Sequence, residues 1–187
     1  MKLTAPSYLI LGMLRLGIRS GYGIKKAADV STKHFWPMSL AKVYPELASL
    51  EDAGLIVRSD DPHGARSRHS YEPTEAGEQA LLAWLGSLRD APPHVRDERL
   101  LRLFFADALP RDDQLALLRR LRESDEAAAA WIRQEIVPLA GAAEQAGTRF
   151  PVAVARLSAD IYSFAARWLA DFEAELAAET RSTGNDR

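Results

Sequence analysis

Residues 39–77 constrain the fold of this chain more than any other segment. They read SLAKVYPELASLEDAGLIVRSDDPHGARSRHSYEPTEAG. Apolar side chains recur every three or four residues at the start of this segment, which predicts a short amphipathic helix. The predicted apolar face consists of Leu40, Val43, Tyr44, Leu47 and Leu50. Gly54 follows at a position where a left-handed C-cap favours a residue without Cβ.

Two β-prone runs follow the predicted glycine stop. Residues 55–57 are Leu, Ile and Val, and residues 59–64 form a cluster of turn-forming side chains. Beyond this turn, Arg66 and Arg68 alternate with serines, which predicts a returning strand with its cations on one face. Thr74 is then placed to cap the start of another helix.

This order of helix, glycine stop, hairpin and helix is typical of a winged helix. In that fold one helix enters the major groove of DNA and a basic hairpin lies beside it. A less specific interpretation is a helix and hairpin within some other α+β domain, because each piece is common by itself. The fold alone does not decide the function either, since winged helices also bind proteins.

The same segment resembles the PadR-type transcriptional regulators. Residues 43–56, VYPELASLEDAGLI, match that family's recognition-helix pattern of a Tyr-Pro pair, a Leu-x-x-Leu-Glu run and Gly-Leu-Ile. Residues 8–14 (YLILGML) and 21–24 (GYGI) resemble the family's first helix and the start of its second. Residues 99–106, RLLRLFFA, resemble the longer C-terminal extension of its virulence-activator-like branch.

This resemblance implies a dimeric winged helix that binds DNA, usually as a repressor and often under the control of a small molecule. It also implies a mainly α fold with a small β-hairpin wing. The expected division is a winged helix-turn-helix domain over residues 1–90, an all-helical dimerisation and effector region over 91–180, and a flexible tail over 181–187. Many members carry a Gly-containing turn before the Tyr-Pro pair, whereas this chain has SLAK at residues 39–42. Base contacts of other members therefore do not transfer to this chain.

Pro45 conflicts with a regular helix that starts near Ser39. A proline cannot donate a hydrogen bond to the carbonyl four residues earlier, and inside a helix it costs about 3 kcal/mol. Two explanations are open: either the helix begins later, with Pro45 in its first turn, or the helix is bent at Pro45.

The chain beyond the proline-marked joint of residues 89–94 predicts helices only. Three are expected, over about residues 96–108, 110–137 and 151–178. So few helices form a thin core, and the wide apolar stripe of the last helix needs a cover, for which a second copy of the chain is the natural candidate. The predicted dimer interface consists of Leu157, Ile161, Phe164, Trp168 and Phe172.

The predicted partner is double-stranded DNA. A two-fold dimer would bind an inverted repeat with half-sites about 34 Å apart, or a multiple of that spacing. The predicted contacts are Lys25, Lys26, Ser39, Lys42, Tyr44, Arg66, Arg68 and His69. The alternative for each charged member is a solvated surface position, and for the two adjacent lysines it weighs as much as the DNA contact.

Other functions find less support in the sequence. Trp84, Trp131 and Trp168 are candidates for lining a site for a flat aromatic effector, although aromatic residues at helical spacing more often belong to the core. The four histidines show no zinc-ligand spacing, cysteine is absent, and no nucleophile elbow occurs. We therefore expect neither an enzyme nor a cofactor or metal. The alternative function is a helical protein–protein adaptor that uses the winged helix without DNA.

Composition and charge agree with a cytoplasmic regulator. The absence of cysteine suits a reducing compartment, and no apolar run approaches the roughly 20 residues that span a bilayer. The net charge of −2 argues against a protein that coats nucleic acid indiscriminately. Residues 1–90 carry 11 basic and 10 acidic side chains, against 13 and 16 in residues 91–187, and all five lysines lie within the first 42 residues. This bias places the expected phosphate contacts in the N-terminal domain.

Overall fold

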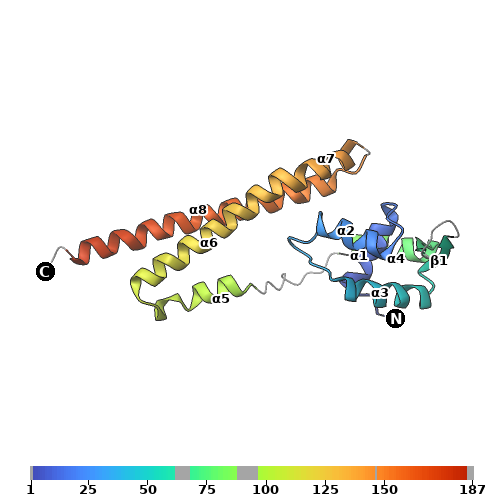
Figure 1. The fold of residues 1–187 in the computed structure, drawn as a ribbon, viewed down its shortest axis with the longest axis horizontal. Helices are drawn as coiled ribbons and strands as arrows, with labels where there is room; N and C mark the ends of the chain where they lie inside the picture. The colour runs from blue at the N-terminus through green and yellow to red at the C-terminus, as the bar shows by residue number, and fades with distance from the viewer. Residues whose placement is uncertain (1, 62–67, 88–96, 146, 185–187) are drawn as a thin grey trace. The chain divides into compact units, whose positions relative to one another are not determined.

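The computed structural model describes residues 2–61, 68–87, 97–145 and 147–184. The chain forms two compact units, Met1–Pro92 and Pro93–Arg187 (Figure 1). The first unit contains α1 (Ala5–Arg15), α2 (Gly21–Asp29), α3 (Leu40–Asp52), β1 (Ile56–Asp61), β2 (Arg68–Pro73) and α4 (Glu75–Gly86). The predicted succession of helix, glycine stop, hairpin and helix is therefore confirmed.

The hairpin is antiparallel and is joined to the rest of the unit at its base. Its register runs from Ile56 opposite Pro73 to Asp61 opposite Arg68. The backbone N–H of Tyr71 also donates to the carbonyl of Arg19, at 2.8 Å, in the turn between α1 and α2. This bond fixes the inner end of the wing against the helical part of the unit.

The core of this unit lies between α1, α2, α3 and the inner end of the hairpin. Its most deeply buried side chains are Ile10, Leu11, Leu14, Ile24, Val43, Leu47, Leu50 and Ile56. The predicted apolar face of α3 is wrong at two positions, because Leu40 and Tyr44 are 38% and 49% exposed. The buried residues of α3 are Val43, Leu47 and Leu50, about one in each turn of the helix. Tyr44 follows Val43 directly and therefore lies at the edge of this narrow buried face. There the Tyr44 ring packs on Gly21, where a Cβ would come within 2.8 Å of the ring atom Cε1.

Pro45 lies well inside α3. Because α3 starts at Leu40, the explanation that places Pro45 in the first turn is wrong. The carbonyl of Ala41 loses its usual donor. Both Ala41 and Pro45 are exposed, so solvent water can reach that carbonyl. The proline is therefore tolerated on the outer face of the helix.

The two predicted caps are confirmed. Gly54 ends α3 with a positive φ of 68°. The Thr74 hydroxyl accepts a hydrogen bond from the N–H of Gly77 at 3.1 Å and donates to the carbonyl of Gly54 at 2.8 Å. These bonds clamp the start of α4 on the turn that follows α3.

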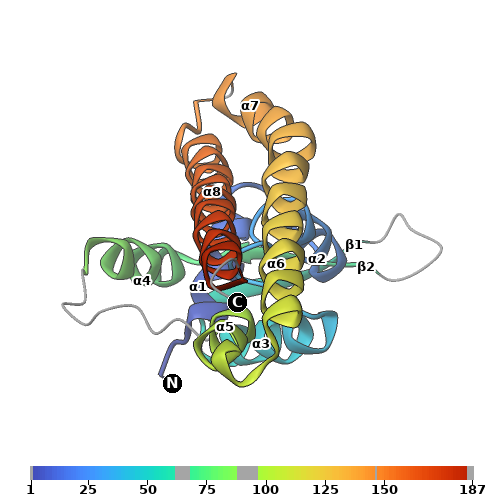
Figure 2. The same ribbon diagram turned by 90° about the vertical axis from the view of Figure 1, so that its left-hand side faces the viewer.

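Helices are the only regular elements in the described part of the second unit. It contains α5 (Glu98–Phe104), η1 (Ala106–Ala108), α6 (Arg111–Trp131), η2 (Ile132–Ile136), α7 (Val137–Gln145) and α8 (Phe150–Gly184). The helices α6 and α8 lie side by side in both views (Figures 1 and 2). Ion pairs of 3.2 Å between Arg111 and Glu179 and of 2.6 Å between Arg119 and Glu173 show that the two helices are antiparallel.

The helix bounds differ from the predictions in three places. The predicted helix over 96–108 is shorter and ends in a 3-10 turn. The predicted helix over 110–137 passes through a π turn, η2, and continues as α7 to Gln145. This π turn comes just before Pro138, which has no N–H for the preceding turn. The last helix continues to Gly184, so the first part of the predicted flexible tail is helical.

The predicted joint at residues 89–94 lies outside the described residues. None of the helices in the described ranges has the length and apolarity of a membrane-spanning segment.

Candidate nucleic-acid interface

The start and outer face of α3 carry three of the eight side chains that the sequence assigns to DNA. Ser39 is the N-cap of α3, and its hydroxyl makes no capping hydrogen bond. Lys42 and Tyr44 are exposed on the following turn, while Val43 and Leu47 between and beyond them are fully buried. The buried side chains hold α3 against the core, which leaves its N-terminal half facing solvent.

A polar contact fixes α3 to the start of α1. Ser7, which is fully buried, donates a hydrogen bond to the Glu46 carboxylate of α3, and its oxygen accepts the backbone N–H of Thr4 at 2.9 Å. This link sets the position of α3 and so of its exposed side chains. This link was not predicted from the sequence. A serine within the apolar run of residues 5–14 was the available signal.

The cations whose side chains the structure describes in this unit fall into two groups. One group is neutralised by neighbouring carboxylates: Arg15 by Glu78, Arg19 by Glu72, Lys25 by Asp29 and Arg58 by Glu51. The other group consists of exposed lysines that form no ion pair with any residue the structure describes: Lys2, Lys26, Lys33 and Lys42. Phosphate contact favours charges that are not already paired. The geometry therefore separates Lys26 from its neighbour Lys25, and it adds Lys33, which the sequence analysis left out.

The predicted wing contacts are only partly visible. Arg66 lies outside the described residues. Arg68 pairs with Asp61 in the register of the hairpin, but its side chain is likewise outside the described set. His69 is exposed on β2 opposite Asp60. On the same hairpin, burial raises the pKa of the Tyr71 phenol, and Arg58 opposes that shift. Tyr71 therefore serves as a neutral core residue of the wing.

An unpartnered apolar stripe runs along α8. Its members recur at alternating steps of four and three residues, the heptad spacing of helices that pack against another helix. They are Phe150, Val154, Leu157, Ile161, Phe164 and Trp168, with exposed fractions between 38% and 83%. The stripe includes all predicted interface residues except Phe172, which is half-buried and stacks on Trp168 with ring centroids 5.4 Å apart.

The three tryptophans proposed to line an effector site lie in different surroundings. Trp84 stacks on Tyr8 in the first unit, with ring centroids 4.6 Å apart. Trp131, at the end of α6, is 40% exposed. Trp168 lines a hollow of about 460 Å³ between α5, α6 and α8, together with apolar side chains that include Leu103 and Phe164.

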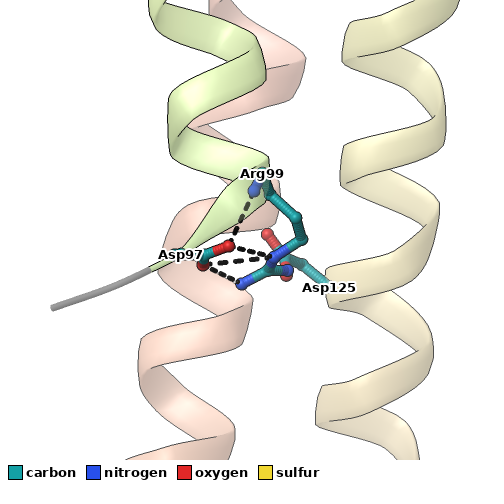
Figure 3. A network of polar contacts seen from close by, with 3 residues as sticks. All are labelled: Asp97, Arg99 and Asp125. Atoms are coloured by element: carbon teal, nitrogen blue, oxygen red, sulfur yellow. Dashed lines mark hydrogen bonds and ion pairs between the residues drawn. The ribbon is translucent and has the colours of Figure 1, made fainter.

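A triad of charged side chains forms the polar edge of this hollow (Figure 3). Asp97 caps α5 by accepting the Arg99 N–H, and it also pairs with the Arg99 guanidinium at 2.8 Å. The same guanidinium pairs with Asp125 of α6, which is only 4% exposed, and lies 5.9 Å from the centre of the Tyr162 ring. Hydrogen bonds from Arg99 lower the pKa of Asp97. No local sequence pattern indicated this triad, because Asp125 is remote from the other two residues in the chain.

These features define a winged helix-turn-helix protein with a helical C-terminal extension. Residues 10–83 match the sequence profile of the "Transcriptional regulator PadR-like family". Over these residues the chain is similar to this family of transcriptional regulators, and the family resemblance seen in the sequence is confirmed. Since the family is not one of enzymes, the expectation of a non-enzymatic protein is confirmed as well.

The chain is similar in sequence to the negative transcriptional regulator PadR of Bacillus subtilis. The two are 34% identical over 113 residues, which are 60% of this chain and 62% of PadR. The matched segment thus spans less than two thirds of that relative.

Solved structures match over most of this chain. Bacillus subtilis PadR in complex with operator DNA has a TM-score of 0.79 at 25% identity, covering 92% of this chain and 99% of PadR. The same protein in complex with p-coumaric acid has a TM-score of 0.72 at 26% identity, covering 91% and 98%. The Vibrio cholerae virulence activator AphA has a TM-score of 0.65 at 24% identity, covering 96% and 99%, and shows the fold alone. The predicted fold, mainly helical with a hairpin wing and long C-terminal helices, is confirmed.

Proposed function

We propose that this protein is a sequence-specific DNA-binding regulator, acting as a repressor, that binds an inverted-repeat operator as a homodimer. The observation that carries the proposal is the solvent-facing half of α3, where Ser39, Lys42 and Tyr44 project from a fold similar to that of PadR on operator DNA. The N-terminus of a helix carries N–H groups and a partial positive charge, both of which favour phosphate.

The unpaired lysines support the electrostatic part of this proposal. Lys26 lies in α2, Lys33 lies between α2 and α3, and Lys42 lies in α3. Their ammonium groups form no ion pair with a described carboxylate, so they can contact phosphate without first breaking one. Arg66, Arg68 and His69 complete the proposed contact through the wing. If a dimer makes about six phosphate contacts, log K should fall by roughly five for each tenfold rise in salt.

The apolar stripe of α8 supports a homodimer. In one copy of the chain, Phe150 (83% exposed) and Leu157 (60% exposed) meet solvent along the first half of this heptad seam. Burying apolar surface contributes about 25 cal/mol per Å², so pairing this seam with a second copy is strongly favourable. A two-fold dimer would also place two copies of α3 on successive turns of the duplex.

A small-molecule effector is the remaining part of the proposal. Its support is the hollow beside Trp168 and the similarity to a PadR structure that contains p-coumaric acid. The competing function, an adaptor that binds protein alone, gives no role to unpaired lysines around α3.

The test is a gel shift of the full-length protein against the DNA upstream of its own gene, at two ionic strengths and with scrambled competitor. Lys42→Ala should weaken operator binding roughly tenfold, the effect of one lost charged contact. Arg120→Ala, which removes an exposed cation from α6 in the other unit, is the matched control and should bind as the parent does. The paired change Arg66→Ala with Arg68→Ala should weaken binding to any duplex and flatten the salt dependence. Equal retention of operator and scrambled DNA by the parent protein would refute the proposal.

A further inference from the structure

The hollow between α5, α6 and α8 has the size of a small-molecule site. Its volume of about 460 Å³ falls inside the range of roughly 300–1,000 Å³ that is usual for ligand sites. Leu103, Leu121, Phe164 and Trp168 supply an apolar and aromatic wall. Such walls bind flat aromatic molecules by stacking and by exclusion of water.

Polar contacts, rather than apolar packing, hold α5 at the rim of this hollow. None of the residues of α5 is buried. The helix is attached through Arg99, which pairs with Asp125 of α6 (Figure 3). The guanidinium of Arg99 also lies over the ring of Tyr162 of α8. Leu100 and Leu103 of α5 line the hollow and are not buried.

The charges at the hollow select the class of ligand. Among the residues that the structure describes, Asp97, Arg99 and Asp125 are the only charged ones that line the hollow, and their formal charges sum to −1. The guanidinium of Arg99 already forms ion pairs with two carboxylates, those of Asp97 and Asp125, and its distance to the Asp97 carboxylate is 2.8 Å. A cation placed here would meet a net negative edge and the electron-rich faces of Phe164 and Trp168, whereas a carboxylate would be repelled.

We propose that this hollow binds a flat aromatic cation, with its charge toward Asp97 and Asp125 and its rings against Phe164 and Trp168. The inference rests on the effector part of the proposed function and names the ligand class of that site. It differs from p-coumaric acid, the carboxylic acid in the PadR structure.

A second copy of this chain is the competing occupant, because Ile161, Phe164 and Trp168 also belong to the apolar stripe of α8. The other half of that stripe, Phe150, Val154 and Leu157, does not line the hollow. If the dimer interface is formed by Phe150, Val154 and Leu157, the hollow remains accessible to a ligand.

Two dyes of similar three-ring shape and opposite charge test the proposal: 9-aminoacridine, a cation, and anthracene-9-carboxylate, an anion. Their fluorescence is titrated with the full-length protein in the absence of DNA. The parent protein should bind the cation at least about tenfold more tightly, as expected for one charge-assisted contact. Asp125→Asn keeps an acceptor for Arg99 but removes the net charge, so it should bring the two affinities close together. Asp113→Asn, an equal charge change in the exposed first turn of α6, is the matched control and should keep the preference.

Ala165→Leu tests the location, because Ala165 lines the hollow and a larger side chain there would occupy it. This variant should lose binding of the cationic dye. Equal binding of both dyes by the parent, an unchanged preference in Asp125→Asn, or full binding by Ala165→Leu would each overturn the proposal. Binding seen only when the dimer is dissociated would assign the hollow to a second copy and overturn it too. Operator binding is measured on the same preparations. If the protein binds the operator but shows no preference for the cationic dye, only the proposed ligand class is refuted. If it prefers the cationic dye but does not bind the operator, only the proposed regulatory function is refuted.

Discussion

The contact between α4 and the turn after α3 can be tested by adding a single methyl group at Gly77. A Cβ at this position would overlap the carbonyl oxygen of Leu55 and lie 3.0 Å from its carbonyl carbon and 3.3 Å from Cδ2 of Leu11. Two of these neighbours are backbone atoms, which cannot rotate away as a flexible side chain can. The start of α4 must therefore move, which strains the bonds that Thr74 makes to Gly77 and Gly54.

The expected cost has two parts. Overpacking a tight site costs about 1–3 kcal/mol, and loss of a helix N-cap costs about 1 kcal/mol. Gly77→Ala should thus lower the free energy of unfolding of the first unit by about 2–4 kcal/mol. A helix-propensity gain of up to about 1 kcal/mol opposes this cost and places the result toward the lower end.

Gly12→Ala is the matched control, since Gly12 lies in α1 of the same unit and a Cβ there meets nothing within 4 Å. It should leave stability unchanged or raise it by up to about 1 kcal/mol. The assay is urea unfolding followed by Trp84 fluorescence, in a background where the other tryptophans are phenylalanine, because Trp84 reports on the first unit through its contact with Tyr8. Equal stability of the two glycine variants would refute the reasoning.

Three further predictions concern the other polar and apolar contacts. Ser7→Ala deprives Glu46 and the Thr4 N–H of a buried partner, so the first unit should lose about 1–3 kcal/mol of stability in the same urea assay; an unchanged midpoint would contradict this role. Leu157→Asp should raise the dimer dissociation constant by roughly a hundredfold in analytical ultracentrifugation while the helical content stays constant, because this side chain is exposed in one copy and buried only by the other; a dimer as tight as that of the parent would exclude the stripe as the interface. The lowered pKa of Asp97 contributes stability that is present above the usual carboxyl pKa of 3.8 and is lost as pH falls below it. Asp97→Asn should therefore reduce the acid sensitivity of the second unit, measured as unfolding free energy between pH 6 and pH 3, and an unaltered pH profile would count against the Asp97–Arg99 pair.

The proposed function assigns a DNA-facing surface to the first unit and a self-association surface to the second. Regulation in this arrangement requires that a ligand change either the dimer or the positions of the two copies of α3. The hollow beside Trp168 adjoins the apolar stripe, since the two share Ile161 and Phe164. We therefore expect an occupant of the hollow to act first on the dimer, and the dye titration repeated with operator DNA would measure that coupling.

Local sequence patterns were sufficient to predict much of the secondary structure of the first unit. The spacing of Val43, Leu47 and Leu50, the glycine at position 54 and the capping threonine at 74 each depend on neighbours a few residues away. Helix periodicity, positive φ and capping are short-range effects, so the sequence contains the information needed to predict them. The heptad spacing of apolar residues in α8 could be predicted from the sequence equally well, because it depends on a single helix.

Only the tertiary structure decided which side chains are buried, exposed or paired with a residue of another element. Lys25 and Lys26 are indistinguishable in the sequence, yet one is paired with Asp29 and the other is exposed without a partner in the described chain. The edge position of Tyr44, the tether of Glu46 to Ser7 and the meeting of Asp97 and Arg99 with Asp125 all join residues on different elements. Pairing and burial depend on distances in space, and no one-dimensional periodicity specifies the distance between two helices. The helices and strands of this protein are thus determined by interactions between residues close in the sequence. Which charged side chains are paired and which are exposed is determined only when the helices pack.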